Sequence, residues 1–222
     1  MQGERISGIM AIVLVGVLAG QARAVTPGFV ENFSAAGTAG WGGSIGATNP
    51  GTSGVGGAGD GFLRLAHTAP GNFGAMNTGA DYLGDWDAAG IAQVSFYLND
   101  VETDQDFSFH LLLSTPGGSS GTTWQHNVGL NPPNGQWQQY AIDLGDETQW
   151  TRIRGDLSLA QVRQNVGTLH FRHDLAPYFT SPDPLAGELG IDSIALVVPE
   201  PASALFLLAP LLLRRRRCEQ TS

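Results

Sequence analysis

The sequence predicts an all-β protein, a two-sheet jelly-roll sandwich with one short helix. One observation is the composition: 31 glycines and 12 prolines, with only 14% charged residues, make the chain rich in turn formers and poor in helix formers. The other is a series of short apolar segments with two-residue alternation, separated by glycine-rich turns, along residues 29–197. A chain of 222 residues has room for one such domain, and the absence of an internal repeat excludes a solenoid.

The expected strands are alternating or continuous apolar segments that are rich in β-branched and aromatic residues. In chain order they are residues 62–67, 91–98, 107–113, 137–144, 168–173 and 190–197. One helix is expected over residues 157–165, because Ser158 is a good N-cap and apolar residues follow it at helical spacing. The glycine-rich stretches 37–61 and 115–121 predict long surface loops, where binding sites usually lie.

The charge balance excludes one class of partner. All 11 basic residues are arginines, and the formal net charge of the chain is −9. Between Val25 and Val198 only five arginines stand against 17 acidic residues, so the domain repels phosphate backbones and nucleic acid is excluded as a partner. The single cysteine, Cys218, cannot form an internal disulfide, which leaves packing or a bound metal to stabilise the fold.

Residues 1–24 have the pattern of a secretory signal peptide. An apolar run over residues 9–18 is followed by Ala22 and Ala24, which form the small-x-small pattern that signal peptidase cleaves. The run is shorter than the ~20 apolar residues of a membrane anchor. We therefore expect cleavage near Ala24 and export across the inner membrane, with a mature domain over residues 25–197.

The last 25 residues have three parts: a Pro-Glu-Pro motif, the apolar stretch 202–213 and an arginine cluster. The motif and the cluster consist of Val198, Pro199, Glu200, Pro201, Arg214, Arg215, Arg216 and Arg217. A helix of twelve residues reaches about 18 Å, well short of the ~30 Å hydrocarbon core, and the arginines hold its end in the cytoplasm. Because proline on both sides keeps Glu200 extended, as a protease substrate must be, we expect only transient inner-membrane association.

This three-part tail, residues 198–222, resembles the PEP-CTERM sorting domain of exported Gram-negative bacterial proteins. The resemblance implies recognition by an exosortase, an integral-membrane cysteine protease or transpeptidase. It also implies removal of the tail and a final location at the cell surface or in the extracellular matrix. An ordinary stop-transfer anchor is the alternative interpretation.

Several short segments of the middle of the chain carry a second resemblance, at the level of the fold. They are the opening residues 29–33, the turn and strand 59–65, and the closing strand 191–196. In these segments the chain resembles the laminin B (laminin IV-type) jelly roll and is similar to carbohydrate-binding modules. The resemblance implies a jelly-roll fold and a non-catalytic role in binding carbohydrate or exopolysaccharide.

The same resemblance implies a structural calcium. In such sandwiches an acidic residue near the first strand often shares calcium with an acidic residue of the last strand and with carbonyls of a nearby turn. Glu31 and Asp192 occupy those two positions, and the turn around Asp60 supplies carbonyls. Calcium takes six to eight oxygen ligands, many of them from the backbone, so this set is chemically sufficient. Simple solvation of these carboxylates is the alternative.

Five tryptophans are candidates for stacking on sugar rings, although large aromatic residues are more often in the core. Trp41 and Trp124 lie in Gly- and Thr-rich segments and are the better ligand-binding candidates. No His-Glu-x-x-His, Gly-x-Ser-x-Gly or phosphate-loop pattern occurs, so no catalytic residue is predicted. Two alternatives to a binding protein stay open: a polysaccharide hydrolase or lyase that uses a carboxylate pair, and a ligand-free structural matrix protein.

Overall fold

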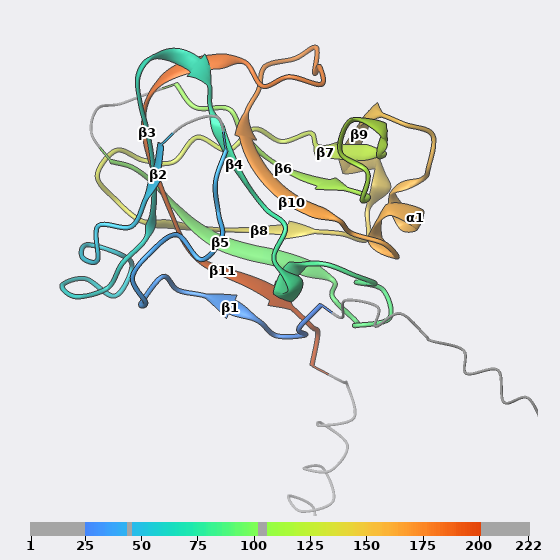
Figure 1. The fold of residues 1–222 in the computed structure, drawn as a ribbon, viewed down its shortest axis with the longest axis horizontal. Coiled ribbons are helices and arrows are strands. Elements are labelled where there is room, and N and C mark those ends of the chain that lie inside the picture. Colours follow the sequence, from blue (N-terminus) through green and yellow to red (C-terminus); the bar gives the residue numbers. More distant parts are fainter. Residues whose placement is uncertain (1–24, 44–45, 102–105, 201–222) are drawn as a thin grey trace, which may run out of the picture.

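The computed structural model describes residues 25–43, 46–101 and 106–200, which form two antiparallel sheets packed face to face (Figure 1). The strands are β1 (Val30–Glu31), β2 (Gly46–Thr48), β3 (Leu63–Asn72), β4 (Gly74–Asn77), β5 (Gln93–Asp100), β6 (Phe109–Ser114), β7 (Thr123–His126), β8 (Gln138–Asp143), β9 (Trp150–Arg154), β10 (Thr168–His173) and β11 (Pro184–Val197). The first sheet has the order β2-β3-β11-β5-β8, with β1 also paired to β11; the second has the order β4-β10-β6-β7-β9. The predicted two-sheet jelly-roll sandwich is confirmed.

All six predicted strands are present. The segment 168–173 forms β10 over the same residues, whereas β11 begins at Pro184, six residues before the predicted start. The five strands that the sequence did not predict, β1, β2, β4, β7 and β9, have two to five residues each. Such short segments carry too few residues to show a period, so neighbouring strands rather than local sequence define them.

The helix α1 (Leu159–Arg163) is shorter than the predicted 157–165, but its start is as expected. The Ser158 hydroxyl accepts from the Gln161 amide at 3.2 Å, and the Gln161 side chain accepts from the Ser158 amide at 2.9 Å. This reciprocal capping box satisfies amides that the first helical turn leaves without partners. The described residues also form three short 3-10 turns. The turn η1 (Ala80–Tyr82) lies between β4 and β5, η2 (Gly118–Ser120) lies between β6 and β7, and η3 (Glu147–Gln149) directly precedes β9.

The core lies between the two sheets and is rich in aromatic rings. Phe171 of β10 is fully buried, and its ring centroid lies 4.8 Å from that of Phe96, 5.5 Å from Trp41 and 6.0 Å from Phe109. These contacts join both sheets and a loop, since Phe96 belongs to β5 and Phe109 to β6 (Figure 1). Rings of this size supply most of the apolar area that a sandwich buries.

The first and last strands lie side by side, as expected for this fold. Val30 pairs with Ala195 and Glu31 pairs with Ile194 in the β1–β11 ladder.

On the outer side of the sheet, Gly190 must lack a side chain, because a Cβ there would lie 2.7 Å from the Trp137 ring. Within the described ranges, no helix is long and apolar enough to cross a membrane.

Candidate functional site

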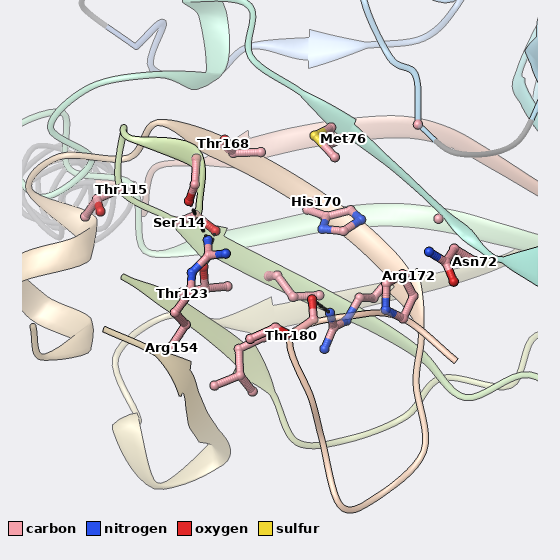
Figure 2. Close-up of a pocket in the computed structure, with 16 residues that line it drawn as sticks. Asn72, Met76, Ser114, Thr115, Thr123, Arg154, Thr168, His170, Arg172 and Thr180 are labelled. Atoms are coloured by element: carbon pink, nitrogen blue, oxygen red, sulfur yellow. Dashed lines mark hydrogen bonds between the residues drawn. The ribbon is translucent and has the colours of Figure 1, made fainter. Parts of the chain in front are cut away.

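The outer face of the five-stranded sheet carries a cleft of about 340 Å³. Most of its lining residues come from all five strands and from the loop after β10, and the others are Gly43, Asn72, Thr115 and Gly118. Ten of the lining residues are labelled in Figure 2. Figure 2 shows Arg154, Thr123 and Ser114 together at one end of the cleft, with Arg172 and Asn72 toward the other. A second hollow of about 860 Å³ shares Met76, Gly118 and Thr168 with the cleft. The two hollows therefore adjoin.

Cross-strand pairing arranges the lining residues in rows, because residues directly opposite in an antiparallel ladder share a face. One row runs from Met76 of β4 through His170 of β10 to Leu112 of β6. A parallel row begins at Thr168 of β10 and continues through Ser114 of β6 to Thr123 of β7, with the Ser114 and Thr123 hydroxyls 2.9 Å apart. The second row ends at Arg154 of β9.

A β-bulge places Arg154 in this row. Trp124 pairs with Arg152, so a regular ladder would pair Thr123 with Ile153; instead Thr123 pairs with Arg154. The extra residue changes the face of the sheet toward which the Arg154 side chain points. Bulges beside binding sites commonly have this effect. The Arg154 guanidinium then lies among neutral acceptors: Nε donates to Gly121 O at 2.9 Å, and Nη2 donates to Thr123 Oγ1 at 3.0 Å.

The loop between β10 and β11 forms one wall of the cleft and is held by the buried Arg172. The Arg172 side chain forms an ion pair with Asp174 and donates to Gln125 Oε1 at 3.0 Å. It also donates to the Thr180 carbonyl at 3.0 Å and to the Phe179 carbonyl at 2.6 Å. One buried guanidinium thus fixes the backbone of the wall, while the Phe179 side chain is 63% exposed beside it.

The histidine of the cleft is neutral at physiological pH. Burial, and secondarily the positive charge of Arg172, lower the pKa of His170 to about 3. A neutral imidazole offers one donor and one acceptor to a ligand. Burial also lowers the pKa of His110, whose Nδ1 lies 2.7 Å from the His126 carbonyl beneath the loop wall.

The two tryptophans predicted to bind ligand lie elsewhere, which is a correction to the sequence analysis. Trp41 is 2% exposed, with its ring 5.4 Å from Tyr82 and 5.5 Å from Phe171 in the core. Trp124 is 8% exposed, lies in β7 rather than in a loop, and donates from Nε1 to Leu157 O at 3.0 Å. Rings that are covered in this way cannot stack on a sugar, because no face is open to solvent.

Two of the three predicted calcium ligands lie together. A Cβ at Gly54 would lie 2.7 Å from Asp60 Oδ2 and 2.9 Å from Asp192 Oδ2, so both carboxylates point toward the same small space, beside the Gly61 carbonyl. Burial, and then the charge of Asp60, raise the pKa of Asp192 to about 6, although backbone amides partly offset these effects. Glu31 instead accepts from the Phe33 amide at 2.9 Å.

The described residues contain no cluster of three or more His, Cys, Asp or Glu side chains suited to a metal. Asp60 and Asp192 each accept from backbone amides, of Gly56 at 2.6 Å and of Val55 at 2.8 Å. An ionised carboxylate has about four acceptor positions, so both keep free lone pairs for a cation. Two carboxylates and a carbonyl therefore fit calcium, which would complete its shell with further oxygens.

The predicted sorting motif begins where the sandwich ends. β11 stops at Val197, and Val198, Pro199 and Glu200 are exposed. Several predicted site residues lie outside the described part of the chain: Ala22, Ala24, Pro201, Arg214, Arg215, Arg216 and Arg217.

Sequence reasoning missed the residues of the cleft itself. The segments 107–113 and 168–173 were predicted as strands, and because successive side chains of a strand point to opposite faces, side chains such as His170 point away from the core. It could not indicate which strands meet, so the row through Thr168, Ser114 and Thr123 had no signal in the sequence.

No protein-family model matches the chain, and no curated protein matches it in sequence. Solved structures do match. The family 11 carbohydrate-binding module from Clostridium thermocellum, solved with a β-1,3-1,4-mixed-linked tetrasaccharide, is 17% identical over 78% of this chain and 96% of that chain, with a TM-score of 0.50. The CBM22-1 xylan-binding domain of Xyn10C from Paenibacillus barcinonensis is 12% identical over 80% of this chain and 100% of that chain, at a TM-score of 0.51.

An exo-β-agarase also matches, at 15% identity and a TM-score of 0.53, over 78% of this chain but only 25% of that chain. The L4b domain of human laminin alpha-2 matches at 10% identity and a TM-score of 0.39. At these identities the likeness concerns the fold alone. The fold-level resemblance to carbohydrate-binding modules is confirmed.

Proposed function

We propose that this protein is a non-catalytic binding protein whose cleft on the five-stranded sheet holds an extracellular polysaccharide. The observation that carries the proposal is the cleft itself, an open hollow on paired strands that is lined by both polar and apolar side chains. Hydroxyls of the half-buried Ser114 and Thr168 line it and can bond sugar hydroxyls, whereas the buried Thr123 hydroxyl already contacts Ser114 and Arg154. Because the cleft adjoins the second hollow, it suits a chain of sugars rather than a single one.

The composition of the cleft favours binding over hydrolysis. Glycoside hydrolases need a general acid and a second carboxylate on opposite sides of the scissile bond. None of the residues that line the cleft is Asp or Glu. The carboxylate of Asp174 lies close by, but it is buried in its ion pair with Arg172 and is not available to a substrate.

A bulky side chain in the cleft should abolish binding. We expect Thr168→Trp to weaken binding of the full chain to whichever of xylan, mixed-linkage β-glucan, polygalacturonate and a sulfated galactan it binds by at least tenfold, because the indole fills the cleft. Titration calorimetry measures the affinity. The matched control is Gln139→Trp, at an exposed position of β8 on the other sheet. Failure of the unaltered chain to bind any of the four, or equal effects of both variants, would contradict the proposal.

We propose further that Asp60 and Asp192 hold a structural calcium with backbone oxygens of the neighbouring turn. Two carboxylates that point into one space repel each other, and the raised pKa of Asp192 reflects this repulsion together with burial. A divalent cation would relieve the repulsion and tie the loop before β3 to β11. The role would be structural, because the site lies away from the lining of the cleft.

Calcium should therefore raise the melting temperature of the full chain. We expect an increase of several degrees between excess chelator and millimolar calcium at pH 7.5, because a ligand of the folded state stabilises it by mass action. The increase should shrink at pH 5, since Asp192, with its pKa of about 6, is protonated there and protonated carboxylates bind calcium poorly. Asp192→Asn should remove the response, and Asp143→Asn, on exposed β8, should keep it. Equal melting in both buffers for the unaltered chain would refute the site.

We also propose export and exosortase sorting through the tail at 198–222. The order of the Pro-Glu-Pro motif, apolar stretch and arginine cluster supports it, as does the exposure of Val198 directly after β11. Mass spectrometry of the surface or secreted fraction should recover a chain that begins near Val25 and lacks Arg214 and everything after it. Recovery of the intact terminus would contradict this proposal.

A further inference from the structure

The cleft is positively charged on an acidic protein. The formal net charge of the chain is −9, yet the lining residues include Arg154 and Arg172 and no acidic residue. The charge of Arg172 is balanced by its buried ion pair with Asp174. His170 is neutral, because burial and the charge of Arg172 lower its pKa. The positive charge of the cleft is therefore that of Arg154.

Arg154 has no carboxylate partner. Among the described residues, ion pairs join Arg64, Arg163 and Arg172 to acidic side chains, and none includes Arg154. Its hydrogen bonds go to uncharged oxygens: the carbonyls of Gly121 at 2.9 Å and Gly118 at 2.7 Å, and the Thr123 hydroxyl at 3.0 Å. These bonds use Nε and Nη2 and leave both hydrogens of Nη1 without an acceptor in the described part of the chain.

The guanidinium is held in place before any ligand arrives. Three hydrogen bonds fix it, and the bulge at the end of β9 turns it toward Thr123 on the cleft face (Figure 2). A cation that is already oriented loses little side-chain entropy on binding. Hydrogen bonds between an arginine and an anion are also about twice as strong as those between neutral groups. Arg154 therefore favours an anionic group on the ligand.

The rest of the lining does not favour an uncharged sugar. Flat sugar faces are commonly bound by aromatic rings, but no Trp, Tyr or Phe is among the lining residues, and the exposed Phe179 lies in the loop wall outside that lining. The hydroxyl row through Ser114, Thr123 and Thr168 suits sugar hydroxyls of any polysaccharide, so it does not select between ligands. The group in the cleft that can select between charged and uncharged polysaccharides is therefore the guanidinium of Arg154.

We infer that the polysaccharide bound in the cleft is an acidic one, whose sugars carry carboxylate or sulfate groups, and that Arg154 binds one of these anions. This inference rests on the proposed binding role of the cleft. It names the chemical class of the ligand, which the solved carbohydrate-binding modules of similar fold do not indicate, because one was solved with a β-1,3-1,4-mixed-linked tetrasaccharide and the other is a xylan-binding domain.

The test compares acidic and neutral polysaccharides with the full chain. Binding is measured by titration calorimetry in 20 mM and 200 mM NaCl to polygalacturonate, a sulfated galactan, xylan and mixed-linkage β-glucan. We expect at least one of the two acidic polymers to bind at least tenfold more tightly than either neutral one at 20 mM NaCl, with a smaller difference at 200 mM because salt screens the charge. Preference for polygalacturonate assigns the anion to carboxylate, and preference for the sulfated galactan assigns it to sulfate.

Two variants of Arg154 distinguish binding at this residue from an effect of the protein's overall charge. Arg154→Gln should weaken binding of the preferred acidic polymer at least tenfold, whereas Arg154→Lys, which keeps the charge, should retain most of it. Arg152→Gln is the matched control, since it removes the same charge from the same strand at a residue that lies over Trp124, 5.8 Å from its ring centroid, and should change affinity less than twofold. Circular dichroism establishes that each variant is folded.

The outcomes distinguish this inference from the proposed function. If the neutral polymers bind as tightly as the acidic ones, the acidic ligand is refuted; if Arg152→Gln and Arg154→Gln weaken binding equally, the assignment of the anion to Arg154 is refuted. In both cases the binding role stands. If none of the four polymers binds, the proposed function fails, and the inference fails with it.

Discussion

Phe171→Ala should destabilise the protein by about 3–5 kcal/mol, the usual cost of removing a buried phenyl ring. Phe171 is fully buried and contacts rings from both sheets and from the loop that carries Trp41. Its removal leaves a cavity that neighbouring strands cannot close without breaking their ladders, so both the transfer and the cavity costs apply. Urea unfolding followed by tryptophan fluorescence measures the change.

Phe179→Ala is the matched control, because Phe179 is the same residue type at 63% exposure. Its expected effect is within ±0.5 kcal/mol, as for most surface substitutions. A loss below 1 kcal/mol for Phe171→Ala would show that the two sheets do not pack around this ring. With a total stability of 5–15 kcal/mol for a typical domain, the expected loss is large enough to raise the unfolded fraction at 37 °C.

Arg172→Met should also cost about 3–5 kcal/mol, but for an electrostatic reason. It leaves the buried carboxylate of Asp174 without its cation, and breaking a buried pair on one side is costly because the remaining charge is unpaired. It also removes the donors to the carbonyls of Phe179 and Thr180, so the loop that walls the cleft loses its attachment. We expect polysaccharide binding to weaken together with stability.

The electrostatic origin of this loss can be tested through its pH dependence. In the Arg172→Met variant the pKa of Asp174 rises further above its unfolded value, because the opposing charge is gone. A carboxyl with a raised folded-state pKa penalises folding at high pH and not at low pH, so the loss should be smaller at pH 4.5 than at pH 7.5. The double variant Arg172→Met with Asp174→Asn should be more stable than the single variant at pH 7.5. Equal losses at both pH values, with no recovery in the double variant, would contradict the mechanism.

The fold was predictable where a segment carries its own pattern. β5 alternates between buried Val94, Phe96 and Leu98 and half-buried residues between them, and that period is visible in the sequence. The capping box at Ser158 is equally local, because its two partners are three residues apart. β4 and β7 were missed because four residues each, with no clear alternation, become strands only when β10 and β6 supply their hydrogen-bond partners.

The candidate site was less predictable than the fold. Trp41 and Trp124 were expected at a ligand because their neighbours are turn residues, but the sheets close over both rings. The sequence did not predict Arg154 as a ligand-binding residue of a cleft, since only the bulge against β7 turns it into the cleft. Asp60 and Asp192 were placed correctly as neighbours, because the resemblance in fold fixes which strands and turns meet.

By itself, the sequence determined the sandwich class, the acidic net charge of the domain, and the order of the signals that predict export. These properties depend on composition and on residues close together in the chain, so they can be read without coordinates. Only the tertiary structure decided which side chains form the cleft. The row from Thr168 to Arg154 joins four strands, and its members meet because of strand pairing, a bulge and a loop held by one buried arginine.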